Sequence, residues 1–195
     1  MAIYTTYADI LRPQEQQKSW AYDALLVLGG SLLIAASAQL AIHVPFSPVP
    51  ITGQTFAVIF LAALFGSRRG AATVLAYLAE GAAGMPVFAG GTGGLPVFAG
   101  PTAGYLLGFI VAAFVVGMLA ERGWDRRVGT TIAAMIAGNA IIYLFGVIWL
   151  STLLGLSGAI TAGLTPFLIG DVMKITLAAA LLPTGWKLLS DRSSK

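Results

Sequence analysis

The chain has 195 residues, of which 57% are hydrophobic and only 10% are charged, and its mean hydropathy is +0.86. Soluble domains are about half apolar and a quarter charged, so this composition excludes an ordinary soluble domain and predicts a membrane protein. Cysteine is absent and there is one histidine, His43, which excludes disulfides and cysteine-ligated metals and argues against a histidine metal site. We therefore expect neither a metal nor a cofactor.

Because about 20 apolar residues cross a hydrocarbon core, this length allows about six helical spans. The N-terminal 20 residues are polar and of mixed charge, unlike a cleaved signal peptide. Apolar runs predict helices at 24–42, 54–66, 69–84, 102–120, 128–152 and 165–189. We expect an all-α integral membrane protein: a six-transmembrane-helix bundle forming one membrane domain over 23–189, with a polar cytoplasmic N-tail (1–22) and a cytoplasmic C-tail (190–195).

The basic residues follow a regular alternation along the chain. Ten of the eleven fall in the tails or in the even-numbered connections: Arg12, Lys18, Arg68, Arg69, Arg122, Arg126, Arg127, Lys187, Arg192 and Lys195. The positive-inside rule makes that side cytoplasmic, so both termini are cytoplasmic and the loops at 43–53, 85–101 and 153–164 lie outside. Because the net charge of +3 arises at segment ends, it indicates a lipid bilayer and no nucleic-acid partner.

The three outer loops differ in composition. Pro45, Pro48 and Pro50 predict a stiff, extended first loop. The second holds a tandem repeat, MPVFAGGTGG (85–94) and LPVFAGPTAG (95–104), matching at seven of ten positions and rich in glycine. The third is predicted to be small and flexible. Since the second and third spans are short, the loops are expected to dip into the membrane and cover a cavity open to the outer side.

Asp171 and Lys174 are charges inside the sixth apolar run. At 1.5 Å per residue from Pro166 they lie about 8 Å and about 12 Å along the helix, in the outer half, and their spacing of three places them on one face. They could form a self-neutralising ion pair with no ligand. Intramembrane charges more often mark a solute path, which favours a binding role. Four aromatic residues are expected to wall the pocket: Phe56, Phe88, Phe98 and Tyr105.

Three other motifs allow either a functional or a purely structural interpretation. GLSG at 155–158 fits an intramembrane serine protease weakly, because Ser157 has no plausible base, so no catalytic residue and no enzyme activity are expected. Asn139 and Tyr143 share a helix face and could point into the cavity or bridge helices. Small residues along the first span suit close packing, within the bundle or against a partner.

No G-x-x-x-x-G-K-[ST] motif occurs, so any energy from ATP must come from a partner. The alternative is a stand-alone secondary carrier for a small vitamin-like solute. Such carriers often show paired broken helices in inverted repeats, a feature that this sequence does not display.

Six segments together resemble the BioY family, the biotin-specific substrate-binding (S) subunits of energy-coupling factor (ECF) transporters. The resemblance extends over about residues 30–183, and the segments follow one another in this order: VPFSPVPITGQTF, LFGSRRG, GMPVFAGGTGG, GPTAGYLLGF, GNAIIYLFG and TPFLIGDVMK. The resemblance implies high-affinity biotin binding from the outer side, in the plasma (inner) membrane of a prokaryote. It also implies a transmembrane coupling protein and ABC-type ATPases as partners.

The resemblance also implies which residues bind the substrate. They are Asp171 and Lys174 of the G-D-x-x-K motif and the glycine-rich loop around Phe88, Gly90 and Gly91, with Tyr105 in the apolar wall. Some relatives carry Asn where this chain has Gly90, so the hydrogen bond of that side chain is either lost here or supplied by Gln54 or Asn139. We favour Asp171 accepting from a ureido N–H and Lys174 donating to the ureido oxygen, although Lys174 on the valerate carboxylate is also chemically reasonable. The proline-rich loop would act as a lid.

Overall fold

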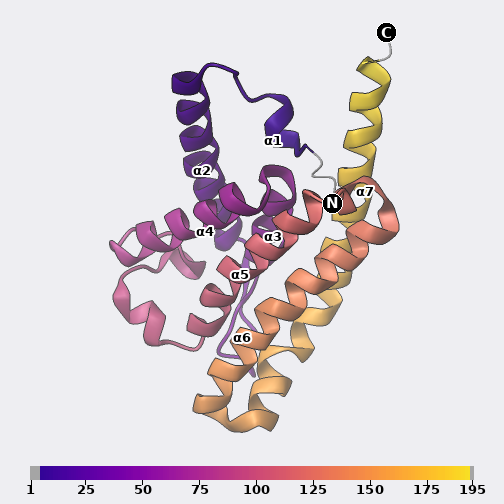
Figure 1. The fold of residues 1–195 in the computed structure, drawn as a ribbon. Coiled ribbons are helices and arrows are strands. Elements are labelled where there is room, and N and C mark those ends of the chain that lie inside the picture. Colours follow the sequence, from indigo (N-terminus) through magenta and orange to yellow (C-terminus); the bar gives the residue numbers. More distant parts are fainter. Residues whose placement is uncertain (1–4, 194–195) are drawn as a thin grey trace.

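The computed structural model describes the backbone of residues 5–193 and the side chains of residues 5–189. It is a helical bundle with a small hairpin and turns at one end (Figure 1). The helices are α1 (Tyr7–Ile10), α2 (Gln16–Gln39), α3 (Gln54–Phe65), α4 (Ser67–Ala82), α5 (Ala103–Ala120), α6 (Val128–Gly163) and α7 (Leu168–Ser193). The strands are β1 (Ala41–Ile42) and β2 (Ile51–Thr52), and the 3-10 turns are η1 (Ala89–Gly91), η2 (Leu95–Ala99), η3 (Trp124–Arg126) and η4 (Thr165–Phe167).

The six predicted spans correspond to α2 through α7. By length and composition, the stretches long and apolar enough to cross a membrane in the described chain are 16–39, 103–120 and 128–189, the last of which includes both α6 and α7. The prediction that the second and third spans are short is confirmed, because α3 has 12 residues and α4 has 16. The helix of the first span, α2, begins at Gln16, earlier than the predicted start at 24.

The prediction of a small flexible loop at 153–164 was wrong. Helix α6 continues to Gly163, interrupted at Gly155, whose backbone has φ 72° and ψ 164°. Beyond this kink the chain is helical again, because Ala159 and Ala162 are buried against the bundle and stabilise the last turns. The glycine-rich composition marked a change of direction rather than an irregular loop.

The tight connection between α3 and α4 shows how local sequence sets the packing. Gly66 takes φ 87°, a left-handed conformation suited to glycine, and donates its N–H to Ala62 O. The carboxylate of Glu121 then caps α4: it accepts from Ser67 N at 2.7 Å and from Ser67 Oγ at 2.8 Å. The turn is thereby fixed to the end of α5, which is the most buried of the three long apolar stretches in the described chain.

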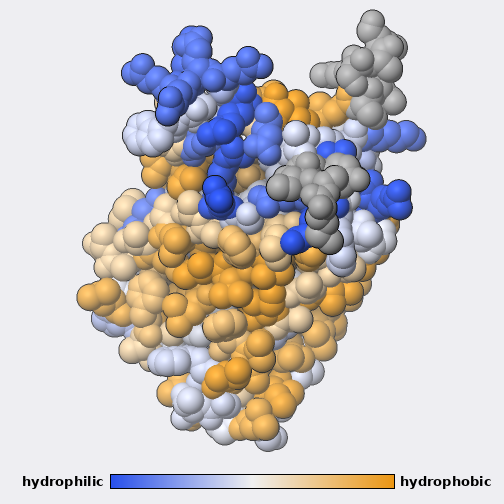
Figure 2. Space-filling view, in the orientation of Figure 1, coloured by the Kyte–Doolittle hydropathy of each residue, from blue (hydrophilic) through white to orange (hydrophobic). Residues whose placement is uncertain are grey.

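In the view of Figure 2, hydrophilic residues gather at one end of the molecule, where α1 and the start of α2 lie, and an apolar belt covers the middle of the face shown. At the hydrophilic end Arg69 forms ion pairs at 2.8 Å with both Asp9 and Asp23, and Arg12 pairs with Asp23 at 2.6 Å. This network holds α1 against α2 and α4. The grouping agrees with the charge alternation for the described residues; Lys195 and the side chain of Arg192 lie outside them.

Candidate ligand-binding cavity

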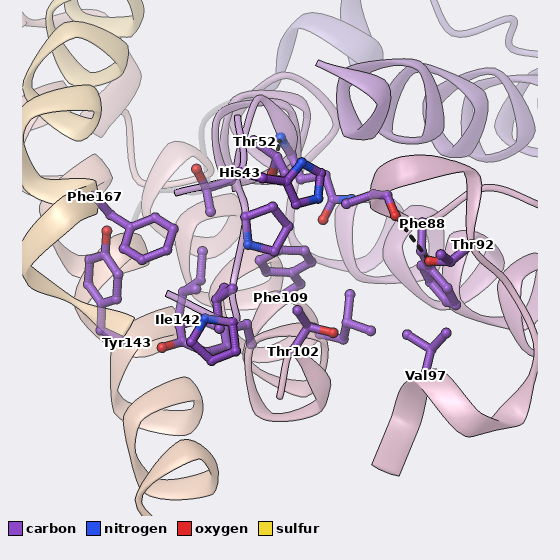
Figure 3. Close-up of a pocket in the computed structure, with 18 of the residues that line it drawn as sticks. His43, Thr52, Phe88, Thr92, Val97, Thr102, Phe109, Ile142, Tyr143 and Phe167 are labelled. Carbon is purple, nitrogen blue, oxygen red and sulfur yellow. Dashed lines mark hydrogen bonds between the residues drawn. The ribbon is translucent and has the colours of Figure 1, made fainter. Parts of the chain in front are cut away.

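A cavity of about 180 Å³ lies at the end of the bundle opposite the hydrophilic end (Figure 3). It is enclosed by α3, α5, α6, α7, the proline-rich loop before α3 and the glycine-rich loop before α5. It is lined by His43, Pro48, Val49, Pro50, Thr52, Gln54, Thr55, Phe88, Ala89, Thr92, Val97, Thr102, Tyr105, Leu106, Phe109, Ile142, Tyr143, Phe167 and Lys174. The lining is mainly apolar and aromatic with a few polar groups, as small-molecule sites usually are.

The proline-rich loop forms a hairpin over this cavity. Strands β1 and β2 pair antiparallel, with Ala41 opposite Thr52 and Ile42 opposite Ile51. At the far end of the hairpin Ser47 Oγ donates to Ala162 O at 2.7 Å, and Val49 is buried beneath. The hairpin is therefore attached to the end of α6, the segment whose helical continuation the sequence did not predict.

The glycine-rich loop forms a second wall. Gly90 and Gly91 have φ of 71° and 69°, so the chain turns tightly between Phe88 and Thr92, which form an isolated antiparallel bridge. Gln39 binds both sides of this turn, accepting from Gly91 N at 3.1 Å and donating to Phe88 O at 3.2 Å. These contacts hold Phe88 in place as a wall of the cavity.

The phenyl ring of Phe88 is seated by close packing. It lies against Gly81, where a β-carbon would overlap the ring, and meets Tyr77 edge to face with ring centroids 5.4 Å apart. The hydroxyl of Tyr77 accepts from Gln54 Nε2 at 3.0 Å and donates to Val87 O at 3.2 Å. Gln54 thus links the start of α3 to the glycine-rich loop while it also lines the cavity.

Lys174 brings a positive charge to the cavity. Its Nζ donates to Thr55 Oγ1 at 2.8 Å and lies 3.7 Å from Asp171 Oδ1. The carboxylate of Asp171 is buried and accepts a hydrogen bond from the hydroxyl of Tyr143. Lys174, Thr55 and Tyr143 line the cavity, whereas Asp171 lies behind them. The arrangement offers a ligand an ammonium and two hydroxyls, with the carboxylate balancing the charge.

The structure brings together part of the predicted set. Lys174, Phe88, Tyr105 and Gln54 line the cavity. Asp171 does not line the cavity itself but contacts two residues that do, Lys174 and Tyr143.

The other predicted residues occupy different places. Gly90 and Gly91 form the adjoining turn and do not line the cavity. Asn139 does not line it either. Asn139 is buried, and its Nδ2 has no hydrogen-bond partner among the described residues.

Several lining residues were not predicted to bind substrate, including His43, Thr55, Phe109 and Phe167. Thr55 follows Gln54 at the start of α3, and its hydroxyl accepts a hydrogen bond from Lys174, 119 residues further along the chain, a contact that local sequence does not reveal. The sequence does not decide whether Tyr143 points into the cavity or bridges two helices. In the structure it does both, because it lines the cavity on α6 and donates a hydrogen bond to Asp171 on α7.

Comparison with known proteins places this geometry in a family. The chain is 40% identical over 180 residues to the biotin transporter BioY of Rhizobium etli, covering 87% of this chain and 96% of the relative. It is 38% identical over 165 residues to the biotin transporter BioY of Thermotoga maritima, covering 84% and 90%.

The fold also matches a crystal structure of the S-component for biotin from an ECF-type ABC transporter. The TM-score is 0.75 at 25% identity, covering 90% of this chain and 95% of the other. The sequence profile of the BioY family matches residues 12–191. The chain is therefore a multi-pass membrane protein that belongs to the BioY family.

Proposed function

We propose that this chain is a biotin-binding membrane subunit for biotin uptake, energised by a partner ATPase module. The observation that carries the proposal is the cavity. Among its described lining residues Lys174 is the only one of the Asp, Glu, Lys and Arg class, and it is surrounded by apolar and hydroxyl-bearing side chains. Biotin joins a polar ureido ring to an apolar sulfur ring and chain, a distribution that this lining complements.

In the proposed complex the ammonium of Lys174 donates to the ureido oxygen. The carboxylate of Asp171 balances the charge of Lys174, and it accepts a ureido N–H when the hydroxyl of Tyr143 yields that position. The ring of Phe88 and the side chain of Tyr105 enclose the apolar parts, and Gln54 provides a further polar contact. Gly90 and Gly91 remain predicted binding residues through the family resemblance, and Asn139 remains predicted as a substitute donor for the Asn that some relatives carry at the Gly90 position.

The proposed membrane arrangement follows from the charge distribution. The hydrophilic end, with both termini, faces the cytoplasm, and the cavity faces outside in the inner membrane of a prokaryote. The bundle over 23–189 acts as one membrane domain with short cytoplasmic tails. Because the sequence has no nucleotide-binding P-loop, ATP would be hydrolysed by ABC-type ATPases joined through a transmembrane coupling protein.

Calorimetric titration of the detergent-purified chain with biotin tests the binding, with thiamine and riboflavin as controls. We expect saturable one-site binding of biotin alone. Folded protein that binds none of the three, or all equally, would overturn the assignment of substrate. Uptake by proteoliposomes with and without the ATPase module then separates the subunit from a stand-alone carrier, which would transport biotin along an ion gradient without the module.

A further inference from the structure

A second pocket lies at the hydrophilic end, away from the proposed biotin cavity, and is called here the η3 pocket. Its volume is about 870 Å³, and it is formed by the N-terminal segment, η3, the start of α6 and the last turns of α7. The lining residues that matter here are Arg126, Arg127, Lys187, Trp186, Ile10 and Val128. Three of them are cations, and no acidic residue lines the η3 pocket within the described part of the chain.

The wall of the η3 pocket is held by buried contacts. Asp125, 2% exposed, accepts a hydrogen bond from the indole N–H of Trp186. The guanidinium carbon of Arg126 lies 4.2 Å from the centroid of the Trp186 ring, and its Nη2 donates to Thr5 O at 3.2 Å. On its other side Trp186 packs on Tyr7, with ring centroids 4.4 Å apart. The position of Arg126 is therefore set by the fold.

The η3 pocket combines positive charge with exposed apolar side chains. Ile10 is 45% exposed and Val128 is 54% exposed beside the three cations. Tryptophan and basic residues concentrate where a bilayer's headgroups meet its acyl chains. The hydrophilic end of the molecule borders the apolar belt (Figure 2). A ligand suited to this lining is anionic at one end and apolar at the other.

We propose that the η3 pocket binds the headgroup of an anionic phospholipid, with Arg127 and Lys187 contacting the phosphate and Arg126 held by Trp186 beside them. Basic pockets between membrane helices on the cytoplasmic side recognise such headgroups. The acyl chains would leave over Ile10 and Val128 into the apolar belt. A lipid bound in the η3 pocket would contact the N-terminal segment, α6 and α7 at the same time.

The test is native mass spectrometry of the detergent-purified full chain titrated with phosphatidylglycerol or phosphatidylcholine. The variant is Arg127→Gln with Lys187→Gln. The matched control, Lys18→Gln with Arg68→Gln, removes the same charge at the same end but outside the η3 pocket. With each of the two cations contributing about fivefold, we expect about 25-fold weaker phosphatidylglycerol binding in the η3-pocket variant and little change in the control.

Equal weakening in both variants, or none in either, would overturn the proposal, as would equal affinity of the wild type for the two lipids. Displacement of the lipid by millimolar inorganic phosphate would identify a free-anion site instead. Biotin titration of each variant checks the fold separately, so loss of lipid binding with intact biotin binding concerns the η3 pocket alone. Should the double variant not fold, the wild type's preference for the anionic lipid and its decline with salt decide the question.

Discussion

The hydroxyl of Tyr143 on α6 donates a hydrogen bond to the carboxylate of Asp171 on α7, 28 residues further along the chain. This bond places a neutral donor on the carboxylate, while Lys174 lies 3.7 Å from its other oxygen. Asp171 therefore connects a helix-bridging hydroxyl to Lys174, a cation that lines the cavity. In the proposed biotin complex, Asp171 would therefore affect binding through Tyr143 and Lys174 as well as through the ligand.

Replacing Asp171 with Asn tests this role. We expect biotin affinity to fall by more than about tenfold, because Lys174 loses its counter-charge and a charge-assisted hydrogen bond contributes about 1.5–3 kcal/mol. Calorimetric titration measures the change. Glu15→Gln, which alters an exposed acid at the hydrophilic end, is the matched control. Affinity near that of the wild type in Asp171→Asn would contradict the assigned role.

Tyr143→Phe removes the hydroxyl and leaves a ring that can still pack near Phe167, whose centroid lies 6.3 Å away. We expect biotin affinity to fall about three- to tenfold, because the buried carboxylate of Asp171 loses a hydrogen-bond donor. Tyr22→Phe is the control, since its hydroxyl donates to Ala8 O at the hydrophilic end. Equal affinities of Tyr143→Phe and the wild type would show that this bond does not organise the site.

Ser47→Ala removes the hydrogen bond that attaches the hairpin to Ala162 O. A single hydrogen bond is worth about 0.5–1.5 kcal/mol, so we expect bound radiolabelled biotin to dissociate about two- to tenfold faster, with a smaller change in association. Ser151→Ala, which loses only a bond to Ile148 O within its own helix, serves as comparison. An unchanged dissociation rate would mean that the hairpin does not retain the ligand.

Gly146→Ala tests the packing of Tyr105. A β-carbon at Gly146 would overlap the Tyr105 ring, whose hydroxyl donates to Gly163 O at 2.8 Å. Overpacking of this kind costs about 1–3 kcal/mol, so we expect a lower thermal midpoint and weaker biotin binding. Gly29→Ala is the control, because no atom lies within 4 Å of a β-carbon there. A Gly146→Ala variant as stable as Gly29→Ala would contradict the close contact.

The turns of the glycine-rich repeat could be predicted from the sequence. Its glycines predicted tight turns near a cavity, and the positive φ angles of Gly90 and Gly91 agree with that. The same reasoning applied to 153–164 was wrong, because glycine content alone does not distinguish an irregular loop from a kinked helix. Burial of Ala159 and Ala162 against the bundle decided in favour of the helix.

The sequence by itself determined the membrane class, the six helices, the grouping of basic residues at one end and the presence of an Asp171–Lys174 pair within the last helix. These properties depend on hydropathy, charge and spacing along one segment, which can be evaluated locally. Only the tertiary structure decided that Lys174 enters the cavity while Asp171 lies behind it, and that Thr55 and Tyr143 complete the site. Those relationships depend on the rotation of each helix and on contacts between distant segments, which side-chain packing sets.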